Sequence, residues 1–146
     1  MSYLADSNIL TALSQKHSSQ YFCVKRAMAA RRKDKENIFI FPQNLIEFWS
    51  VATRPLEVNG LNLSIEQTII EVRKFRQNFD FVSDLPNLYS EWERLVQKYQ
   101  VKGKNVHDAR IVAAMMQHGI THLLTFNVKD FSRYNEIIVV DPKEFV

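Results

Sequence analysis

Short apolar runs alternate with longer amphipathic segments along the chain, and this alternation restricts the fold more than any other feature of the sequence. The apolar runs cover residues 3–5, 38–41, 79–82, 122–126 and 137–140, and the run at 79–82 is expected at an edge of the sheet. Helices between successive strands favour parallel strands with crossover connections. The sequence therefore predicts an α/β fold, a three-layer α/β/α sandwich with a central, mostly parallel sheet.

Start and stop signals place helices between these strands. We expect helices over residues 8–13, 18–33, 42–53, 64–75, 86–99 and 105–118. Ser64 with Gln67 three residues later is a capping box, and Pro42 suits a first helical turn. Pro55 and Gly119 mark helix ends, because the residue before proline is biased out of the helical region and glycine readily ends a helix. No repeat or linker interrupts the pattern, so a single domain over residues 1–146 is expected.

The composition is that of an ordinary globular chain. Of the 146 residues, 46% are hydrophobic and 24% are charged. Cys23 is the only cysteine, so it cannot form an internal disulfide, and its place on an apolar helix face predicts a packed thiol rather than a nucleophile. No apolar stretch approaches the roughly 18 residues that span a bilayer, and no secretory segment is recognisable. We therefore expect a cytoplasmic protein with no membrane segment.

The net charge is mildly basic, at +3 with a pI near 9.0. Lysine and arginine gather in local runs, at residues 25–26, 31–33, 73–76 and 98–104. Such runs can follow a phosphate backbone, but solvated helix faces are the commoner explanation. Composition alone therefore favours ordinary surface charge over a nucleic-acid partner.

Three carboxylates occupy positions where the sequence predicts burial. Asp6 ends the first apolar run, Glu47 lies within an apolar helical segment, and Asp108 shares a helical stripe with Ile111 and Val112. Charged side chains are rarely buried unless they are paired or bind a metal. In a parallel sheet with crossover helices, sites form at the carboxyl ends of the strands, which is where Asp6 is expected. Together the three acids predict a divalent-cation site.

Each acid also has a purely structural explanation. Asp6 suits a helix N-cap, a role that is as well supported as metal binding and compatible with it. Glu47 is able to pair with Arg54 on a helix surface, but its apolar neighbours leave little surface for that, which favours a site residue. Asp108 is in the third position of a helix that Asn105 is expected to cap, where an acid complements the helix dipole. Only the combination of the three makes coincidence improbable.

The segment after the fourth predicted strand supplies further candidates. Asn127 at its tip, or Asp130 three residues on, is placed to complete the site, although both residues also suit turns. Ser7, Asn8 and Thr125 are placed to support the carboxylates through hydrogen bonds. Oxygen ligands of this kind suit Mg²⁺ or Mn²⁺, which also bind phosphates. The expected chemistry is metal-activated hydrolysis of a phosphodiester.

Taken in order, four sequence blocks resemble the PIN-domain ribonucleases, in particular the VapC-like toxins of type II toxin–antitoxin systems. The blocks are YLADSNIL at 3–10, NLIEFWSV at 44–51 followed by TRP at 53–55, VHDARIVAA at 106–114, and LLTFNVKDF at 123–131. Each block is weak alone, but the four at these spacings are fairly specific and span nearly the whole chain.

The resemblance implies a central parallel sheet, an acidic Mg²⁺ or Mn²⁺ pocket and endonucleolytic cleavage of RNA. It also implies a homodimer and inhibition by a cognate antitoxin. By this resemblance the metal-site acids are Asp6, Glu47 and Asp108, with Ser7 and Thr125 as the hydroxyl residues beside them. The chain departs from the family pattern at Asn127, where many members have an aspartate. Losing that negative charge is expected to weaken binding of a second metal ion.

Two other functions compete with a nuclease. The departure at Asn127 motivates a non-catalytic PIN module that binds RNA or a protein partner. A phosphoryl-accepting, receiver-like switch is disfavoured, because the second strand does not end in an aspartate and no lysine ends a later strand. If RNA is the substrate, Arg54, Lys102 and Lys104 are the basic residues expected to contact it. The sequence contains no motif that identifies the RNA target.

Overall fold

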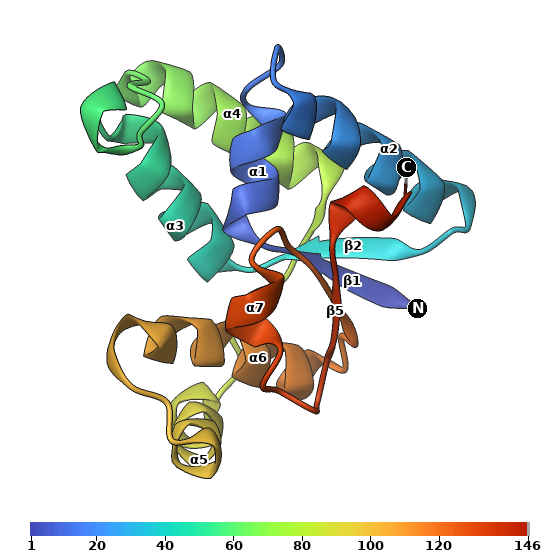
Figure 1. Ribbon diagram of the computed structural model, residues 1–146, viewed down its shortest axis with the longest axis vertical. Coiled ribbons are helices and arrows are strands. Elements are labelled where there is room, and N and C mark those ends of the chain that lie inside the picture. The colour runs from blue at the N-terminus through green and yellow to red at the C-terminus, as the bar shows by residue number, and fades with distance from the viewer. Residues whose placement is uncertain (146) are drawn as a thin grey trace.

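The computed structural model describes residues 1–145 and contains a five-stranded, fully parallel sheet at its centre (Figure 1). The strands are β1 (Ser2–Ala5), β2 (Asn37–Ile40), β3 (Asp80–Phe81), β4 (His122–Leu124) and β5 (Ile138–Val140). Their order is β3-β2-β1-β4-β5, so β1 is central and β3 is at an edge, as expected. In the register, Tyr3 is opposite Ile38 on one side and His122 on the other. The predicted sheet is confirmed.

Seven α-helices connect or follow these strands. They are α1 (Ser7–Leu13), α2 (Ser19–Lys33), α3 (Pro42–Thr53), α4 (Ile65–Asn78), α5 (Leu88–Tyr99), α6 (Val106–His118) and α7 (Val128–Phe131). Three 3₁₀ turns complete the described chain, at Leu56–Val58, Gly103–Asn105 and Pro142–Phe145. Among residues 1–145, no helix is both long and apolar enough to cross a bilayer.

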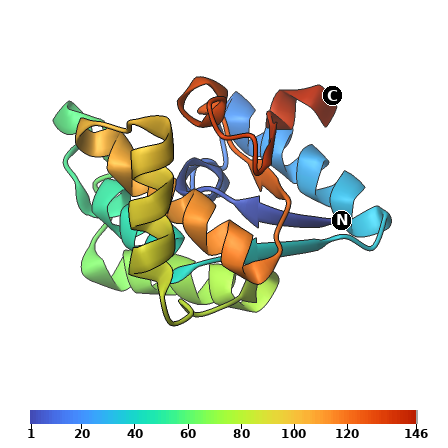
Figure 2. The ribbon, with the colours of Figure 1, turned by 90° about the horizontal axis from the view of Figure 1, so that it is seen from below.

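The sheet separates two apolar cores, because successive strand residues point to opposite faces. Tyr3 and Ala5 pack with α1, α2, α3 and α4, whereas Leu4 packs with α5, α6 and α7. The first four helices lie above the sheet in Figure 1, and Figure 2 looks onto α5 and α6 with the strands behind them. The three-layer α/β/α sandwich that the sequence predicts is therefore confirmed.

The structure differs from the sequence predictions mainly at the ends of elements. Helix α5 begins at Leu88 rather than at residue 86, because Asn87 has a left-handed backbone (φ 69°) that a helix cannot include. Asn105 does not cap α6 with its side chain; its backbone is already helical, and the turn Gly103–Asn105 runs directly into the helix. The strand predicted over 122–126 ends at Leu124, and α7 follows where only a turn was considered.

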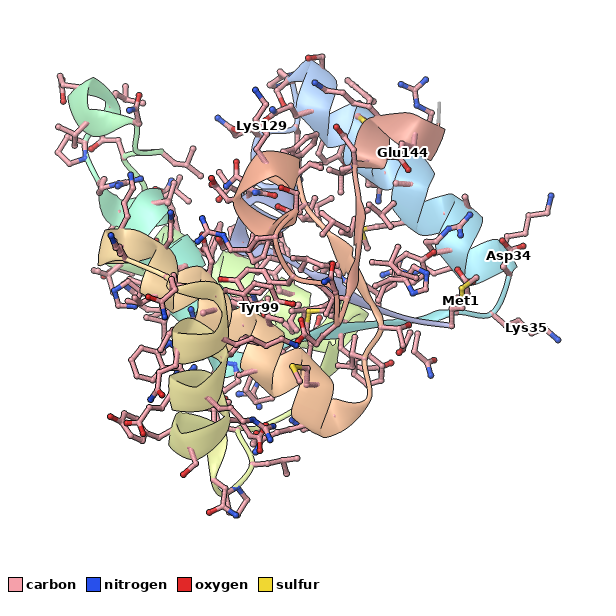
Figure 3. All side chains as sticks on the ribbon, turned by 60° about the horizontal axis from the view of Figure 1, so that its bottom comes forward. Met1, Asp34, Lys35, Tyr99, Lys129 and Glu144 are labelled. Carbon is pink, nitrogen blue, oxygen red and sulfur yellow. The ribbon has the colours of Figure 1, made fainter. Side chains whose placement is uncertain are left out.

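The strand order reverses direction at β1, and the reversal point lies between the carboxyl ends of β1 and β4. The chain passes from β1 outward to β2 and β3, and later returns to place β4 on the other side of β1. In open parallel sheets, ligands bind at such a reversal point. Lys129 marks α7 near this end of the sheet in Figure 3, while Asp34 and Lys35 mark the opposite end, near the start of β2. The fold therefore predicts a site beside the ends of β1 and β4.

Candidate active site

Asp6 lies at the carboxyl end of β1, and it is a buried carboxylate that also caps a helix. Asp6 as a whole is only 5% exposed. Its Oδ1 accepts a hydrogen bond from the backbone N–H of Ser7 at 2.8 Å, and its Oδ2 accepts one from Thr125 Oγ1 at 2.8 Å. Burial raises the pKa of the Asp6 carboxyl, these two hydrogen bonds oppose the increase, and the charge of Asp130 adds to it. Capping and membership of an acidic site therefore coexist at Asp6.

Thr125 joins the ends of β1 and β4 through a single hydroxyl. While Oγ1 donates to Asp6, it accepts hydrogen bonds from Asn8 Nδ2 and from the backbone N–H of Asn127, both at 3.0 Å. Asn8 Oδ1 in turn accepts from the N–H of Phe126 at 3.2 Å. These bonds fix the orientation of the Asp6 carboxylate relative to both strands.

Glu47 projects from the first half of α3 toward Asp6. Gln43 Nε2, one turn earlier, lies 3.4 Å from Glu47 Oε2. Burial raises the pKa of the Glu47 carboxyl, and the negative charge of Asp6 raises it further. Hydrogen bonding by Gln43 and Ser7 and the positive charge of Arg110 act in the opposite direction. Glu47 and Asp6 therefore interact electrostatically although they come from different elements.

The structural explanation that the sequence offered for Glu47 does not hold. Arg54 makes no ion pair with Glu47 within the described chain; instead its Nη2 donates to the carbonyl of Asn59 at 3.5 Å. The expectation that apolar neighbours leave little surface on this helix is also wrong, since Ile46 is 68% exposed. One side of α3 beside Glu47 is open to solvent.

Asp108, in the first turn of α6, has a strongly perturbed carboxyl. Burial and the negative charges of Asp6, Asp130 and Glu47 raise its pKa to about 7, against a smaller opposing effect of His107. Asp130 therefore acts on Asp108 and on Asp6, and it belongs electrostatically to the group. These four residues, Asp6, Glu47, Asp108 and Asp130, are called the acidic cluster below.

Asn127 contributes its backbone to the site. Its N–H donates to Thr125 Oγ1, and its carbonyl accepts from the N–H of Asp130 at 3.1 Å, which starts the short helix α7. The residue itself is exposed. Of the two candidates for the fourth position, Asp130 is the one whose charge acts on the other acids.

The sequence did not indicate Gln43 or Arg110, which connect α3 to α6 beside the acidic cluster. Gln43 Nε2 donates to the carbonyl of His107 at 2.8 Å, and Gln43 Oε1 accepts from Arg110 Nη1 at 2.8 Å. Arg110 Nη2 also donates to Asp84 Oδ2 at 2.8 Å. The only signal in the sequence is spacing: Gln43 is one turn before Glu47, and Arg110 is two residues after Asp108.

The three basic residues proposed to meet RNA are all exposed. Arg54 ends α3, two turns beyond Glu47. Lys102 and Lys104 flank Gly103 in the turn that leads into α6, a few residues before Asp108.

The donor chemistry of the acidic cluster fits a hard divalent cation. Its ligands are oxygens, and a cation would relieve the mutual repulsion that raises the carboxyl pKa values. Within residues 1–145, no three acidic, histidine or cysteine side chains lie close enough to share one ion directly. Mg²⁺ commonly binds through one or two carboxylates and several waters, so this open arrangement suits it better than a closed cage would.

The comparison with known families identifies the family of the fold. The model of the PIN domain family matches residues 3–137. The chain therefore belongs to the PIN domain family. No curated protein matches the sequence significantly.

Several solved structures share the fold at low sequence identity. VapBC2 from Rickettsia felis, bound to a DNA fragment from its promoter, has a TM-score of 0.73 and 18% identity, covering 97% of this chain and 98% of that one. DNA-bound VapBC from Salmonella typhimurium has a TM-score of 0.71 and 15% identity over 97% and 98% of the two chains. VapC20 of Mycobacterium tuberculosis, a toxin that cleaves the sarcin-ricin loop, has a TM-score of 0.65 and 16% identity, covering 89% and 93%.

Proposed function

We propose that the protein is a Mg²⁺- or Mn²⁺-dependent endoribonuclease that acts as the toxin of a toxin–antitoxin pair in the cytoplasm. The observation that carries the proposal is the acidic cluster at the reversal point of the sheet, where burial and the charges of Asp6, Asp130 and Glu47 raise the pKa of Asp108 to about 7. A structural ion-pair network does not explain the cluster, because none of its four acids forms an ion pair within the described chain.

Asp6, Glu47 and Asp108 are the residues we assign to metal binding and catalysis, with Asp130 in preference to Asn127 at the fourth position. The chemistry that a bound Mg²⁺ or Mn²⁺ supplies is activation of a water and neutralisation of charge on the phosphodiester. Thr125 holds Asp6 in one orientation through its hydroxyl, and each carboxylate oxygen keeps a further lone pair that could bind a cation.

The remaining residues around the site orient the acids rather than meet the reacting atoms. Ser7 donates its backbone N–H to Asp6, and its hydroxyl lowers the pKa of Glu47. Asn8 holds the hydroxyl of Thr125. Arg54, Lys102 and Lys104 supply positive charge for the RNA backbone, whose phosphates dominate non-specific affinity.

The toxin role, the antitoxin and a homodimer are supported by similarity of fold. Two of the structures described above are VapBC complexes. The surface also exposes large apolar side chains on several helices, which suits burial by protein partners. These side chains include Phe22 on α2 and Ile65 and Ile70 on α4.

RNA cleavage by purified protein tests the nuclease. Asp6→Asn and Asp108→Asn should each reduce cleavage by more than about 100-fold, beyond what is typical when only groups that orient metal ligands are lost. Asp80→Asn, an exposed acid on β3, is the matched control and should retain activity. Full activity in either site variant, or in excess chelator, would contradict the proposal.

The same assay distinguishes a non-catalytic PIN module, which Asn127 motivates because it replaces a potential acidic ligand. Such a module would bind RNA equally well with and without metal and cleave none of the RNAs tested. Expression of the chain in a bacterial host, with and without the product of the adjacent reading frame, tests the toxin role. Growth arrest that the neighbouring product relieves is the expected result.

A further inference from the structure

Two adjoining hollows lead from Glu47 across the start of α6 to α5. The first has a volume of about 400 Å³ and is lined by residues that include Glu47, Ile46 and Asp84. The second also has a volume of about 400 Å³ and is lined by residues that include Tyr89 and Trp92. His107 and Arg110 line both hollows, so the two adjoin at these side chains. Together they are called the depression below, and Glu47 is the member of the acidic cluster that lines it. Each hollow lies within the range of about 300–1,000 Å³ that small-molecule sites occupy.

The far wall of the second hollow is a pair of aromatic rings. The ring centroids of Tyr89 and Trp92 lie 5.4 Å apart, with 41° between the ring planes. Trp92 is fixed in place because its indole Nε1 donates to the carbonyl of Val106 at 2.7 Å. Tyr89, in contrast, is 67% exposed. A large aromatic side chain so exposed adds little to the core, but it offers a flat apolar face to a ligand.

Arg110 places a fixed positive charge between the aromatic pair and the acidic cluster. Its guanidinium is held by Gln43 Oε1 and Asp84 Oδ2, each at 2.8 Å, so it does not move freely in solvent. Its side chain is still 37% exposed. A guanidinium has more N–H donors than these two bonds use, and the others remain for a phosphate or a base edge.

We propose that this depression is a substrate subsite that holds one unstacked nucleotide of single-stranded RNA next to the bond that is cut. The base stacks on Tyr89 and Trp92, and Arg110 binds its phosphate or base edge. Proteins that bind single-stranded RNA combine positive charge with aromatic faces in this way. The inference rests on the proposed nuclease function, and it adds a site for the substrate that the acids alone do not supply.

A second copy of the chain is the other occupant that an aromatic patch suggests, and the charges disfavour it. The cores of protein interfaces are depleted of charged residues. Here Glu47, Asp84, His107 and Arg110 all line the depression. A polar and partly charged nucleotide matches this lining better than an apolar protein surface does.

Tryptophan fluorescence tests the subsite directly, because the chain has two tryptophans, Trp49 and Trp92. In the Trp49→Phe variant, Trp92 is the only reporter. Metal is removed with chelator so that RNA is bound but not cut, and a short oligoadenylate is titrated in. We expect saturable quenching of Trp92. A ribose-phosphate oligomer of the same length without bases should bind but not quench.

Tyr89→Ala should weaken oligoadenylate binding roughly ten-fold, while Tyr89→Phe, which keeps the ring, should retain near-normal affinity. Equal quenching by the base-free oligomer, or RNA cleavage without any quenching of Trp92, would overturn the subsite while leaving the nuclease proposal intact. Quenching that depends on protein concentration and not on RNA would assign the depression to a second copy, and would also overturn it. Quenching by RNA that the protein never cuts would support the subsite and count against the nuclease.

Discussion

The hydroxyl of Thr125 connects three parts of the site that are far apart in the sequence. It donates to Asp6 and accepts from Asn8 and from the N–H of Asn127. A valine of nearly the same shape would leave both donors without their acceptor and Asp6 Oδ2 without its donor, while Oδ1 keeps the N–H of Ser7. Because each unsatisfied buried group costs about 1–3 kcal/mol, the site tolerates a hydroxyl here and little else.

We therefore expect Thr125→Val to reduce the free energy of unfolding by about 2–4 kcal/mol. Thr125→Ser keeps the hydroxyl and should lose only the packing of one methyl group, about 1 kcal/mol. Urea unfolding of the two variants beside the wild type measures both values. A valine variant as stable as the serine variant would show that these hydrogen bonds contribute little.

Asp108 should destabilise the metal-free protein at neutral and basic pH. Its folded pKa of about 7 lies above its ordinary value of 3.8. The folded state therefore holds the proton more tightly than the unfolded state, and stability falls as the pH rises from about 4 through about 7. Asp108→Asn removes this loss, so it should stabilise the protein more at pH values above 7 than below 5.

The stabilisation by Asp108→Asn should be larger above pH 7 than below pH 5 by on the order of 1 kcal/mol. The effect is small because the half-buried carboxylate is screened by solvent. Urea unfolding in chelator at the two pH values measures it. Asp80→Asn, at an exposed position on β3, is the control and should show no such pH dependence. Equal stabilisation at both pH values would mean that Asp108 ionises normally in the folded protein.

At the scale of elements, the end of α3 depends on a glycine that packs against it. A Cβ on Gly60 would lie 2.0 Å from the carbonyl oxygen of Arg54, so only glycine fits at this approach. Gly119 is the matched comparison. It has a positive φ of +68° but open space around its Cα. A side chain at Gly60 is therefore excluded by steric contact, whereas a side chain at Gly119 is disfavoured only by the backbone conformation.

Gly60→Ala should cost more than about 2 kcal/mol, since backbone has to move, whereas Gly119→Ala should cost about 1 kcal/mol. Thermal unfolding of the two variants compares them. Because Arg54 also ends α3, Gly60→Ala should disturb this helix end first, and hydrogen exchange of the amides at residues 51–54 would detect it. Equal costs for the two alanines would contradict the steric argument.

Helices α3 and α6 carry different acids of the cluster, and Gln43 sets their relative position. It bonds to the carbonyl of His107, next to Asp108, and reaches the carboxylate of Glu47 on its own helix. Gln43→Leu should reduce RNA cleavage about 10- to 100-fold through kcat, the range seen when groups that orient ligands are removed. Gln77→Leu, the same substitution at an exposed position near the end of α4, should leave cleavage unchanged. A loss confined to KM would instead place Gln43 in substrate binding.

The sequence predicted those elements and site residues whose signals are local. Strand and helix types followed from periodicity and caps, and Asp6, Glu47 and Asp108 were proposed as site residues because each interrupts an apolar pattern. Gln43 and Arg110 were missed because their bond joins positions 67 residues apart and breaks no local pattern. Helix α7 was missed because four residues are too few to show a helical period. Asp130 was only one of two candidates until its charge was found to act on Asp6 and Asp108.

For the molecule as a whole, the sheet brings like charges together at one end, and a bound cation should offset this. The acids come from β1, α3, α6 and α7, so their repulsion acts between elements from the whole length of the chain. Metal that binds only the folded state raises stability by about 1.4 kcal/mol at ten times its dissociation constant. For a chain of this size, that corresponds to an increase of about 3–6 °C in Tm.

We therefore expect Mg²⁺ or Mn²⁺ to raise the Tm of the wild type and to leave the Tm of Asp108→Asn nearly unchanged. In chelator at pH values above 7, Asp108→Asn should have the higher Tm of the two proteins, because it lacks the repelled carboxylate. Thermal unfolding of both proteins with and without metal, at ionic strength matched with NaCl, measures these Tm values. Asp80→Asn should follow the wild type throughout. Parallel shifts of the wild type and Asp108→Asn with metal would place the cation somewhere other than the acidic cluster.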